Sequence, residues 1–409
     1  MKRVFLSGAG MVTSLGTSLE ETWQGLLEGK SGVRYMEDWK SLKGLSSHLG
    51  APAPDVDIRS IPRTVRRTMS RMSQLMVHST LDALAKANLD LKTIDPTRVA
   101  IIMGSTTGSP QTYKEYFFKA YEVGGPEGQL GTSFFKVMNH SVASNVASAL
   151  DFCGPVLAPS SACSTSSQAM VMGWEYIKSG LYDIVIAGGA DELHHTSCEV
   201  FDIVFAASKK YNDTPQMSPR PFDKDRDGLV VSEGAGVVVM ESADSMRARG
   251  VAALGEVLGG AFGCSGAHMS KSDTEAMMGI IRQSISRAAS ENEKPRYVNA
   301  HATGTFQGDQ AEVEAIHGVL GSETYVSSLK GHLGHSLAPC GAIEAALSCK
   351  MMNEGLILPT RNLVEVSPEC DLVQHVKEPL PVVFSTAVST NFAFGGFNTS
   401  LFLGRSPDC

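Results

Sequence analysis

The sequence lacks a long apolar run and has no excess of basic residues. A helix that spans a bilayer needs about 20 apolar residues, and no stretch of this chain approaches that length. The formal net charge of −8 gives no general attraction to nucleic acid or to anionic lipid. Glycines interrupt the N-terminal apolar stretch too early for the core of a signal peptide. We therefore expect no membrane span, no nucleic-acid partner and a cytoplasmic location.

The sequence also lacks the short motifs of several enzyme classes. Its eight cysteines are scattered with no C-x-x-C pair, so neither a disulfide framework nor a cysteine zinc site is indicated. His332 and His335 have no H-E-x-x-H context and no third ligand at a suitable spacing, so we expect no metal. No G-x-S-x-G elbow is present, which disfavours a serine hydrolase. Residues Gly25–Ser31 resemble a phosphate-binding loop but have three residues between the glycines instead of four.

Short apolar segments alternate with amphipathic segments along the chain, which predicts a layered α/β fold. With 409 residues, 43% of them hydrophobic and 19% charged, the chain is long enough for two core-sized units. Ser18 and Glu21 belong to a capping box that opens a helix toward Leu27. Further helical patterns run over about residues 65–87, 164–179, 274–289 and 342–353. The predicted strands are Val4–Gly8, Val99–Gly104, Ile184–Ala187, Val237–Glu241, Val382–Ser389 and Asn398–Leu403.

A glycine-rich turn precedes a terminal apolar strand in two places. Residues Glu233–Gly236 lead into Val237–Met240, and Phe394–Gly396 lead into Asn398–Leu403. A turn and strand that recur near the end of each portion suggest an internal duplication. We predict two related halves that meet near residue 250, residues 1–250 and residues 251–409.

Cys163 has the most informative surroundings of any residue in the chain. The apolar run Val156–Ala158 precedes it, small and hydroxylated residues surround it, and an apolar-periodic stretch follows. A strand, a tight turn and a helix in this order expose the thiol and aim a helix N-terminus at it, which favours the thiolate and lowers the pKa. We predict that Cys163 is a nucleophile and that the other seven cysteines are small buried hydrophobic residues.

Three more groups lie in glycine-rich loops downstream of Cys163. His301 follows the apolar Tyr297–Ala300, and Lys330 and His335 bound a second loop. Loops at strand ends commonly present catalytic side chains, although a single histidine in such a loop is more often structural. The turn Asn391–Asn398 offers backbone N–H groups that could form an oxyanion hole with the N–H of Cys163; the alternative is an ordinary turn with core phenylalanines.

A basic segment, Arg59–Arg71, holds five arginines and no acidic residue. In a helix, Arg63, Arg67 and Arg71 are spaced to share one face. The segment is either a solvated helix face or a docking surface for an acidic partner.

Together, these residues resemble a β-ketoacyl-[acyl-carrier-protein] synthase of the decarboxylating, Cys-His-His kind. Such enzymes are the condensing enzymes of type II fatty acid and polyketide synthesis. The resemblance covers essentially the whole chain, and its motifs follow the order of the family. The motifs are Ser161–Ser166, Arg220–Gly228 with Glu233–Gly236, Asn299–His301, Lys330–His335 and Phe392–Asn398.

The resemblance implies a thiolase-type fold, in which two duplicated α/β halves form alternating α-β-α-β-α layers. It implies that Cys163 accepts the acyl group, that His301 and His335 serve the malonyl half-reaction, and that Lys330 orders the histidines with support from Glu344. It further implies oxyanion and gating roles for Phe394 and Phe392. The implied docking surface for an acyl carrier protein comprises Arg63, Arg66, Arg67 and Arg71, although Thr64 stands where relatives often carry Lys.

The implied reaction is a decarboxylative condensation of acyl-Cys163 with malonyl-carrier protein. It needs no metal or organic cofactor, because the phosphopantetheine arm belongs to the carrier protein. The family is usually homodimeric, and a heterodimer with a Cys-less relative is an alternative. Rival readings are a coenzyme A-dependent thiolase, an initiating synthase with His and Asn, and a subunit that shapes a heterodimer without catalysis. His335 in the second loop argues against the first two, and Cys163 argues against the third.

Several positions depart from the family pattern. They comprise Ala302, Ala393 and Phe397, and the run Ala338-Pro339-Cys340, which stands where the family carries Gly-Ala-Ala. None of these positions is a reacting group, but all are expected to line or support the acyl pocket. Chain length, unsaturation and pathway therefore do not follow from the sequence.

Overall fold

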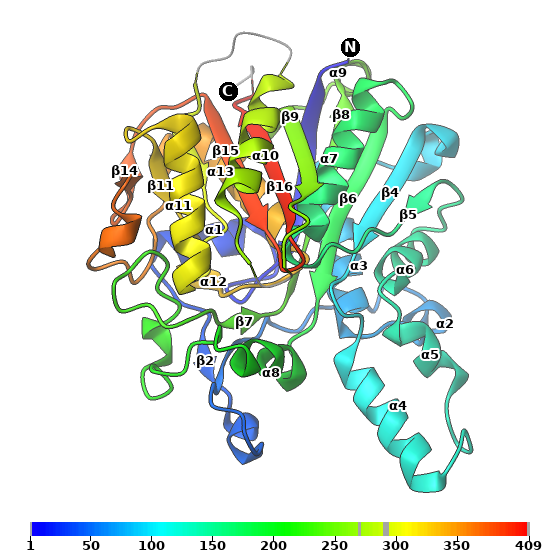
Figure 1. Ribbon diagram of the computed structural model, residues 1–409. Helices are drawn as coiled ribbons and strands as arrows, with labels where there is room; N and C mark the ends of the chain where they lie inside the picture. The colour runs from blue at the N-terminus through cyan, green and yellow to red at the C-terminus, as the bar shows by residue number, and fades with distance from the viewer. Residues whose placement is uncertain (1, 269–270, 289–293, 407–409) are drawn as a thin grey trace.

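The computed structural model describes residues 2–268, 271–288 and 294–406. Strands and helices alternate along the chain, as the apolar patterning predicts (Figure 1). The strands of the main sheet are β1 (Val4–Val12), β4 (Val99–Gly104), β5 (Val156–Leu157), β6 (Ile184–Asp191), β8 (Gly234–Ser242), β9 (Gly255–Cys264), β10 (Tyr297–Asn299), β11 (Tyr325–Ser327), β13 (Gln374–His375), β15 (Thr386–Phe392) and β16 (Phe397–Gly404). Two small sheets are formed by β2 (Arg34–Tyr35), β3 (Leu49–Ala51) and β7 (Val231–Ser232), and by β12 (Leu356–Ile357) and β14 (Leu380–Pro381).

The helices of the described residues vary widely in length. The longer ones are α3 (Arg71–Lys86), α4 (Pro110–Val123), α7 (Thr165–Lys178), α10 (Thr274–Ser286), α11 (Phe306–Leu320) and α13 (Cys340–Glu354). The shorter ones are α1 (Leu19–Leu27), α2 (Arg63–Arg66), α5 (Gly131–Val137), α6 (Ser141–Ala149), α8 (His195–Ile203), α9 (Ala243–Arg249) and α12 (Lys330–Leu333). None of these helices has the length and apolarity that crossing a membrane requires.

The order of strands in the main sheet repeats. The first portion runs β1-β8-β6-β4-β5 and the second runs β9-β16-β15-β10-β11-β13, with β1 and β9 paired antiparallel where the portions meet. The two strands associated with the glycine-rich segments are equivalent, because β8 lies beside β1 as β16 lies beside β9. Phe394–Gly396 precede β16 as a turn, whereas Gly234–Gly236 already belong to β8. The predicted internal duplication is confirmed at the level of topology.

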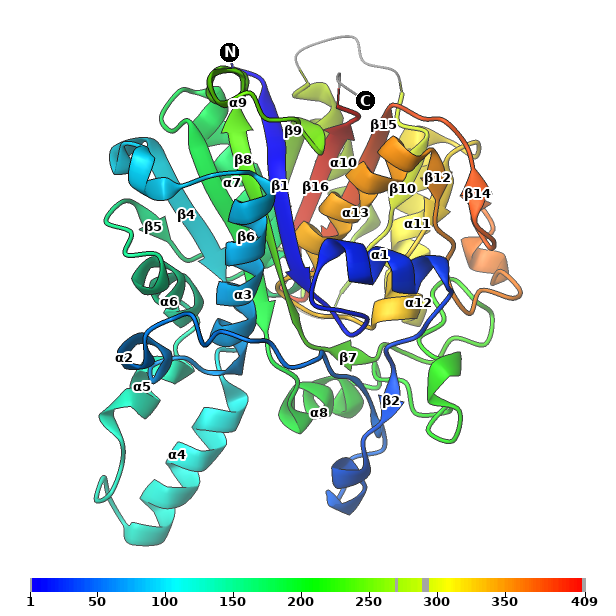
Figure 2. The same ribbon diagram turned by 180° about the vertical axis from the view of Figure 1, so that it is seen from behind.

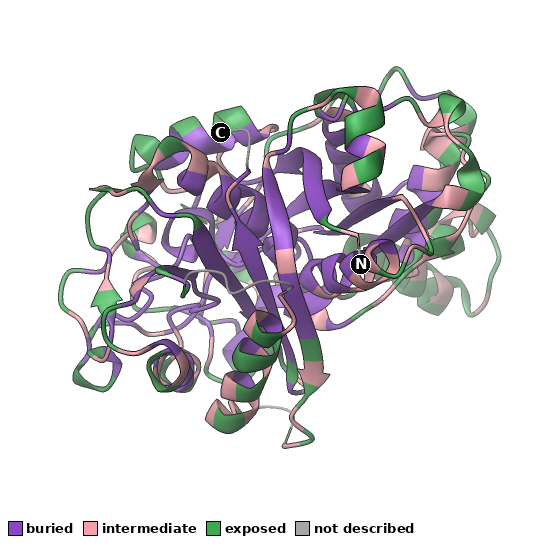
Figure 3. Cartoon of the chain, turned by 90° about the horizontal axis from the view of Figure 1, so that it is seen from above, coloured by how far each residue is buried: buried purple, intermediate pink, exposed green. Residues whose placement is uncertain are grey.

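Helices lie in layers on both portions of the sheet. α3 and α6 pack on strands of the first portion, α10 packs on strands of the second portion with α11 against it, and α7 and α13 contact strands of both (Figures 1 and 2). Viewed from above, the central strands are buried and the peripheral helices carry the exposed residues (Figure 3). This arrangement is the predicted thiolase-type α-β-α-β-α fold.

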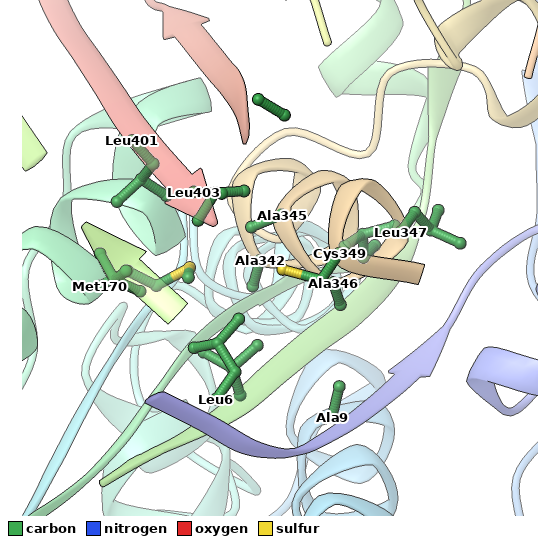
Figure 4. Packing of buried hydrophobic residues seen from close by; sticks show 14 of the residues in the cluster. Leu6, Ala9, Met170, Ala342, Ala345, Ala346, Leu347, Cys349, Leu401 and Leu403 are labelled. Atoms are coloured by element: carbon green, nitrogen blue, oxygen red, sulfur yellow. The ribbon is translucent and has the colours of Figure 1, made fainter. Parts of the chain in front are cut away.

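Helix α13 is buried on almost every side because it lies between the two portions of the sheet. An amphipathic helix needs one apolar stripe, but a helix enclosed by other elements needs small or apolar residues all round. The helix packs on β8, β15 and β16, and its alanines and Cys349 share one apolar core with Leu6 of β1 and Leu401 of β16 (Figure 4). The labelled core residues are Leu6, Ala9, Met170, Ala342, Ala345, Ala346, Leu347, Cys349, Leu401 and Leu403.

Two predicted elements differ from the structure. The helix expected over residues 65–87 is broken between α2 and α3, because Ser70 is extended and the Thr68 hydroxyl donates to Asn145 Oδ1 of α6. The strand expected from Val382 begins only at Thr386. The predicted capping box forms only in part. Ser18 Oγ accepts a hydrogen bond from Glu21 N, as expected, but the Glu21 carboxylate accepts from Thr17 N instead of Ser18 N.

Candidate active site

The duplicated topology brings the candidate residues together at one end of the strands. Cys163 follows β5 and precedes α7, and Lys330 and His335 occupy the equivalent connection between β11 and α13. His301 follows β10. Because equivalent connections leave the same end of the two portions, residues more than a hundred positions apart converge.

Cys163 lies in a short turn at the N-terminus of α7. The turn Ala162–Ser164 is a single 3₁₀ turn, and Ala162 has a φ of 49°, a left-handed conformation that is costly for a residue with a Cβ. Thr165 Oγ1 donates to the Ala162 carbonyl at 2.7 Å and accepts from Ser161 N at 3.0 Å. These bonds hold the strained turn and fix the direction of the thiol.

The two histidines contact each other and the thiol. His335 Nε2 lies 2.9 Å from Cys163 Sγ, and the His301 and His335 ring centroids are 5.1 Å apart at an interplanar angle of 83°. The Leu337 N–H donates to His335 Nδ1 at 3.4 Å. Since that bond makes Nδ1 an acceptor, the proton of the neutral ring is on Nε2, and His335 donates its hydrogen bond to the sulfur.

Burial controls the charge of these groups. Burial lowers the pKa of His301 and of His335 well below 6.5, and the ammonium of Lys330 lowers both further, so both rings are neutral at physiological pH. Burial also raises the pKa of Cys163 to about 12, although Lys330 opposes this rise. The prediction of a lowered Cys163 pKa is therefore wrong. The cause is the burial of the thiol, which outweighs the nearby helix N-terminus.

Lys330 and Glu344 form a buried ion pair beside the histidines. The Lys330 Nζ to Glu344 Oε1 distance is 2.5 Å, and both side chains are almost fully buried. Burial lowers the pKa of Lys330, but the Glu344 carboxylate more than compensates and raises it overall, so the ammonium is retained. Asn391 Nδ2 donates to the second carboxylate oxygen of Glu344 at 2.8 Å. The predicted support of Lys330 by Glu344 is present as a direct contact.

A pocket connects the thiol to the surface. Cys163, His301 and His335 line it together with the two predicted phenylalanines, Phe392 and Phe394. Phe392 is buried, whereas Phe394 is 42% exposed and its ring lies 5.5 Å from that of Phe201. Phe394 lies in a turn closed by the bond from Ala393 N to the Phe397 carbonyl, in which both following glycines have positive φ values.

Some of the residues that depart from the family pattern line the pocket, and the others contact elements that hold the pocket in place. Ala302 and Ala393 line the pocket. Ala338 supports α7, because its carbonyl accepts from Ser166 N and its N–H donates to the buried Asp191 carboxylate. Pro339 caps α13. The Phe397 carbonyl accepts from Ser164 Oγ at 3.1 Å, next to the nucleophile.

Two carboxylates that the sequence motifs did not point to shape the His301 loop. Glu312 accepts from the N–H groups of His301 and Ala302 at 2.8 and 2.7 Å, and Asp309 accepts from Thr303 N at 3.0 Å. Burial raises the pKa of Glu312 to about 7 and that of Asp309 to about 6. The sequence did contain a signal for this role, because Asp309 and Glu312 are spaced i, i+3 in the first half of α11. From that part of the helix, both side chains can reach back to the His301 loop.

The arginine segment does not form one helix face. Arg63 and Arg67 are exposed, Arg66 Nε donates to the Ile61 carbonyl, and the break before α3 separates them from Arg71. Arg71 is half-buried and pairs with the Glu233 and Asp55 carboxylates, each at 2.8 Å. The prediction that Arg63, Arg67 and Arg71 share a face is wrong, because Ser70 interrupts the helix and Arg71 is used inside the protein.

Two family models match consecutive parts of the chain. The family model "Beta-ketoacyl synthase, N-terminal domain" matches residues 1–245, and "Beta-ketoacyl synthase, C-terminal domain" matches residues 254–364. The protein is a condensing enzyme of the thiolase fold, and the chain belongs to the β-ketoacyl synthase family.

The relatives include 3-oxoacyl-[acyl-carrier-protein] synthases and a ketoacyl synthase subunit of a polyketide synthase. The chain is 33% identical over 414 residues to 3-oxoacyl-[acyl-carrier-protein] synthase 1 of Escherichia coli K12, covering 100% of both chains. It is 31% identical to the tetracenomycin polyketide synthase ketoacyl synthase alpha subunit of Streptomyces glaucescens, covering 100% of this chain and 98% of the relative. A β-ketoacyl synthase structure from Burkholderia phymatum STM815 superposes with a TM-score of 0.95 at 37% identity, over 99% of this chain and 100% of that one.

Proposed function

We propose that this chain is a 3-oxoacyl-[acyl-carrier-protein] synthase that elongates a Cys163-bound acyl group with malonyl-carrier protein. The observation that carries the proposal is the convergence of Cys163, His301 and His335 in one pocket, with His335 Nε2 2.9 Å from the sulfur. The carrier-protein substrate is supported by the relatives, whose names specify it. The test is to incubate the protein with acyl- and malonyl-carrier protein and to detect the 3-oxoacyl product by mass spectrometry.

Acyl loading is an exchange of thioesters. Cys163 Sγ attacks the carbonyl of the acyl-carrier thioester, the bond to the pantetheine sulfur breaks, and the proton of the Cys163 thiol ends on the released pantetheine thiol. His335 Nε2–H stabilises the negative charge that develops on the sulfur. We assign the N–H groups of Cys163 and Phe394 to the oxyanion, and such donors contribute about 3 kcal/mol each in a transition state.

Condensation follows decarboxylation of the malonyl group. Cleavage of the C–C bond releases CO₂ and leaves its electron pair in an enolate, whose oxygen is stabilised by hydrogen bonds from His301 and His335. The enolate carbon attacks the acyl-Cys163 carbonyl, a C–C bond forms, and the bond to Sγ breaks. The departing Cys163 thiolate takes up one proton, which balances the reaction.

The reacting groups are proposed to work without a metal or an organic cofactor. Ligand atoms of Cys163, His301 and His335 lie within 4.8 Å of one another, a spacing that also suits a metal. The bond from Leu337 N to His335 Nδ1 favours hydrogen bonding instead, because it places a proton on the nitrogen that faces the sulfur. The pantetheine arm belongs to the carrier protein, and we propose a cytoplasmic location for the reaction.

We propose that Arg63 and Arg67, with Arg66, dock the acidic carrier protein. Charge reversal in Arg67→Glu should raise KM for the carrier-bound acyl group several-fold, since steered association depends on the exposed charge. Salt should raise the wild-type KM as the Debye length falls to about 3 Å near 1 M. Arg247→Glu on α9 is the matched control, because Arg247 is equally a surface arginine. If Arg67→Glu weakens a short pantetheine thioester as much as the carrier-bound substrate, the docking surface lies elsewhere.

We further propose that two copies of the chain associate through α4 and α5. These helices project from the body of the molecule (Figures 1 and 2), and only Pro110 and Thr112 of α4 are buried. A 14-residue helix is marginal in water without tertiary packing. The nearby β5 is a terminal strand of the sheet and is free to pair. The exposed apolar residues are Phe117, Phe118, Tyr121, Leu130, Phe134 and Phe135.

Light scattering should give the wild-type protein twice the 43.5 kDa chain mass. The double variant Phe117→Asp with Phe134→Asp should have the mass of one chain. The two carboxylates would be buried in the proposed interface, where the phenylalanines had contributed apolar surface. Val383→Asp is the control, since Val383 is 72% exposed on a different surface. A wild-type monomer would contradict the proposal, and co-purification with a Cys-less relative would establish the heterodimer instead.

A further inference from the structure

Cys340 lies directly behind the nucleophile. It is the first residue of α13 and is 3% exposed. Its Sγ lies 3.2 Å from the Cys163 carbonyl oxygen and donates a hydrogen bond to it. The N-termini of α7 and α13 therefore meet at the peptide of the nucleophile, and a thiol side chain joins them.

Cys340 also contacts the polar network around Lys330. Asn391 Nδ2 lies 3.4 Å from Cys340 Sγ and 2.8 Å from Glu344 Oε2. Glu344 Oε1 in turn lies 2.5 Å from Lys330 Nζ. A chain of contacts thus runs from the Lys330 ammonium through Glu344, Asn391 and Cys340 to the peptide of Cys163.

The contact bears on catalysis because the nucleophile turn is strained. Ala162 is held in the left-handed region, a conformation that is unfavourable for a residue with a Cβ and persists only where surrounding contacts hold it. Thr165 holds the Ala162 carbonyl, and Cys340 holds the next carbonyl along the chain. The two peptide groups that flank the Cα of Cys163 are thereby each held by one side-chain hydrogen bond.

The thiol of Cys340 remains a donor at neutral pH. Burial raises its pKa well above 9, and the charge of Glu344 raises it further. Cys340 Sγ therefore takes part in two polar contacts, as donor to the Cys163 carbonyl and as acceptor from Asn391 Nδ2, which an alanine side chain could not make.

We propose that Cys340 is a positioning residue for acyl loading, whose S–H fixes the Cys163 peptide and couples it to the Lys330–Glu344–Asn391 network. The role in loading depends on the proposed function. The orientation of the Cys163 thiol, however, can be measured without any carrier protein, because alkylation by iodoacetamide reports on the same sulfur.

The test compares Cys340→Ala with Cys340→Ser. Cys163 alkylation is followed by mass spectrometry of the peptide that contains it, and acyl loading by the mass shift of the intact protein. Loss of one neutral hydrogen bond predicts that the alanine variant is about five- to tenfold slower in both reactions. The serine hydroxyl keeps the donor and should restore both rates to within about twofold. The melting temperature should change little in either variant.

Two results would overturn the proposal. One is an alanine variant that is alkylated and loaded at the wild-type rate. The other is a serine variant that is as slow as alanine at an unchanged melting temperature, which would assign Cys340 to packing alone. If alanine prevents folding, Cys340→Val replaces it as the donor-free variant. If no acyl group loads on any variant while the alkylation rates still differ, the proposed function fails and the positioning role stands.

Discussion

Cys163→Ala is expected to abolish covalent acyl loading and to reduce condensation by at least about 10³-fold, because Cys163 is the one cysteine among the described residues that lines the pocket. The fold should persist, since the side chain is small and the turn is held by Thr165 and by the Cys340 contact. The measurement is the mass of the intact protein after incubation with acyl-carrier protein, followed by the yield of 3-oxoacyl product.

Cys349→Ala is the matched control for that experiment. Cys349 is also fully buried, and burial raises its pKa to about 12, as at Cys163. It lies in the core of α13 away from the pocket and should load normally. An unchanged acyl mass shift in Cys163→Ala would refute the assignment of the nucleophile.

His301→Ala and His335→Ala are expected to lower malonyl decarboxylation by about 10²–10³-fold each, the scale of removing one donor to a developing oxyanion. The two variants should differ in loading. His301→Ala should load Cys163 within about tenfold of wild type, whereas His335→Ala should load more slowly because His335 Nε2 contacts the sulfur. Release of CO₂ and the acyl mass shift are measured separately.

The pH dependence checks the charge state of the histidines. Burial lowers both pKa values, so protonation begins only well below pH 6.5 and decarboxylation should show no acidic limb between pH 6 and 8. His375→Ala is the control, because His375 is a largely buried histidine whose Nε2 bonds the Cys370 carbonyl outside the pocket.

One outcome of the histidine substitutions would reverse the proposed roles. It is a His301→Ala variant that loses acyl loading but retains malonyl decarboxylation.

The arginine segment shows where helical spacing misleads. Arg63, Arg67 and Arg71 have the spacing of one face, but Thr68 bonds to Asn145 of α6 and Ser70 begins a new helix. Arg71 then pairs with Glu233, which is 162 residues away in the chain. Neither contact has a signal in the local sequence, because both partners arrive through the fold.

The strand, turn and helix around Cys163 show the opposite case. The apolar run, the small residues and the following periodic segment all lie within a few residues of Cys163. They are sufficient to place its thiol at the N-terminus of α7. The same reasoning located His301 and the loop from Lys330 to His335 at the ends of strands. The glycine-rich segments likewise indicated the duplication, since one opens and the other precedes the strand that lies beside the first strand of its portion.

The sequence by itself therefore determined the layered α/β pattern, the nucleophile and the loops that carry its partners, because each depends on neighbours within a few residues. Only the tertiary structure decided the charge of Cys163, the loop contacts of Glu312 and the contact of Cys340 with the nucleophile peptide. These properties depend on enclosure by elements distant in the chain. Desolvation and hydrogen bonding act through space, so they are settled only when α7, α11 and α13 pack around the same pocket.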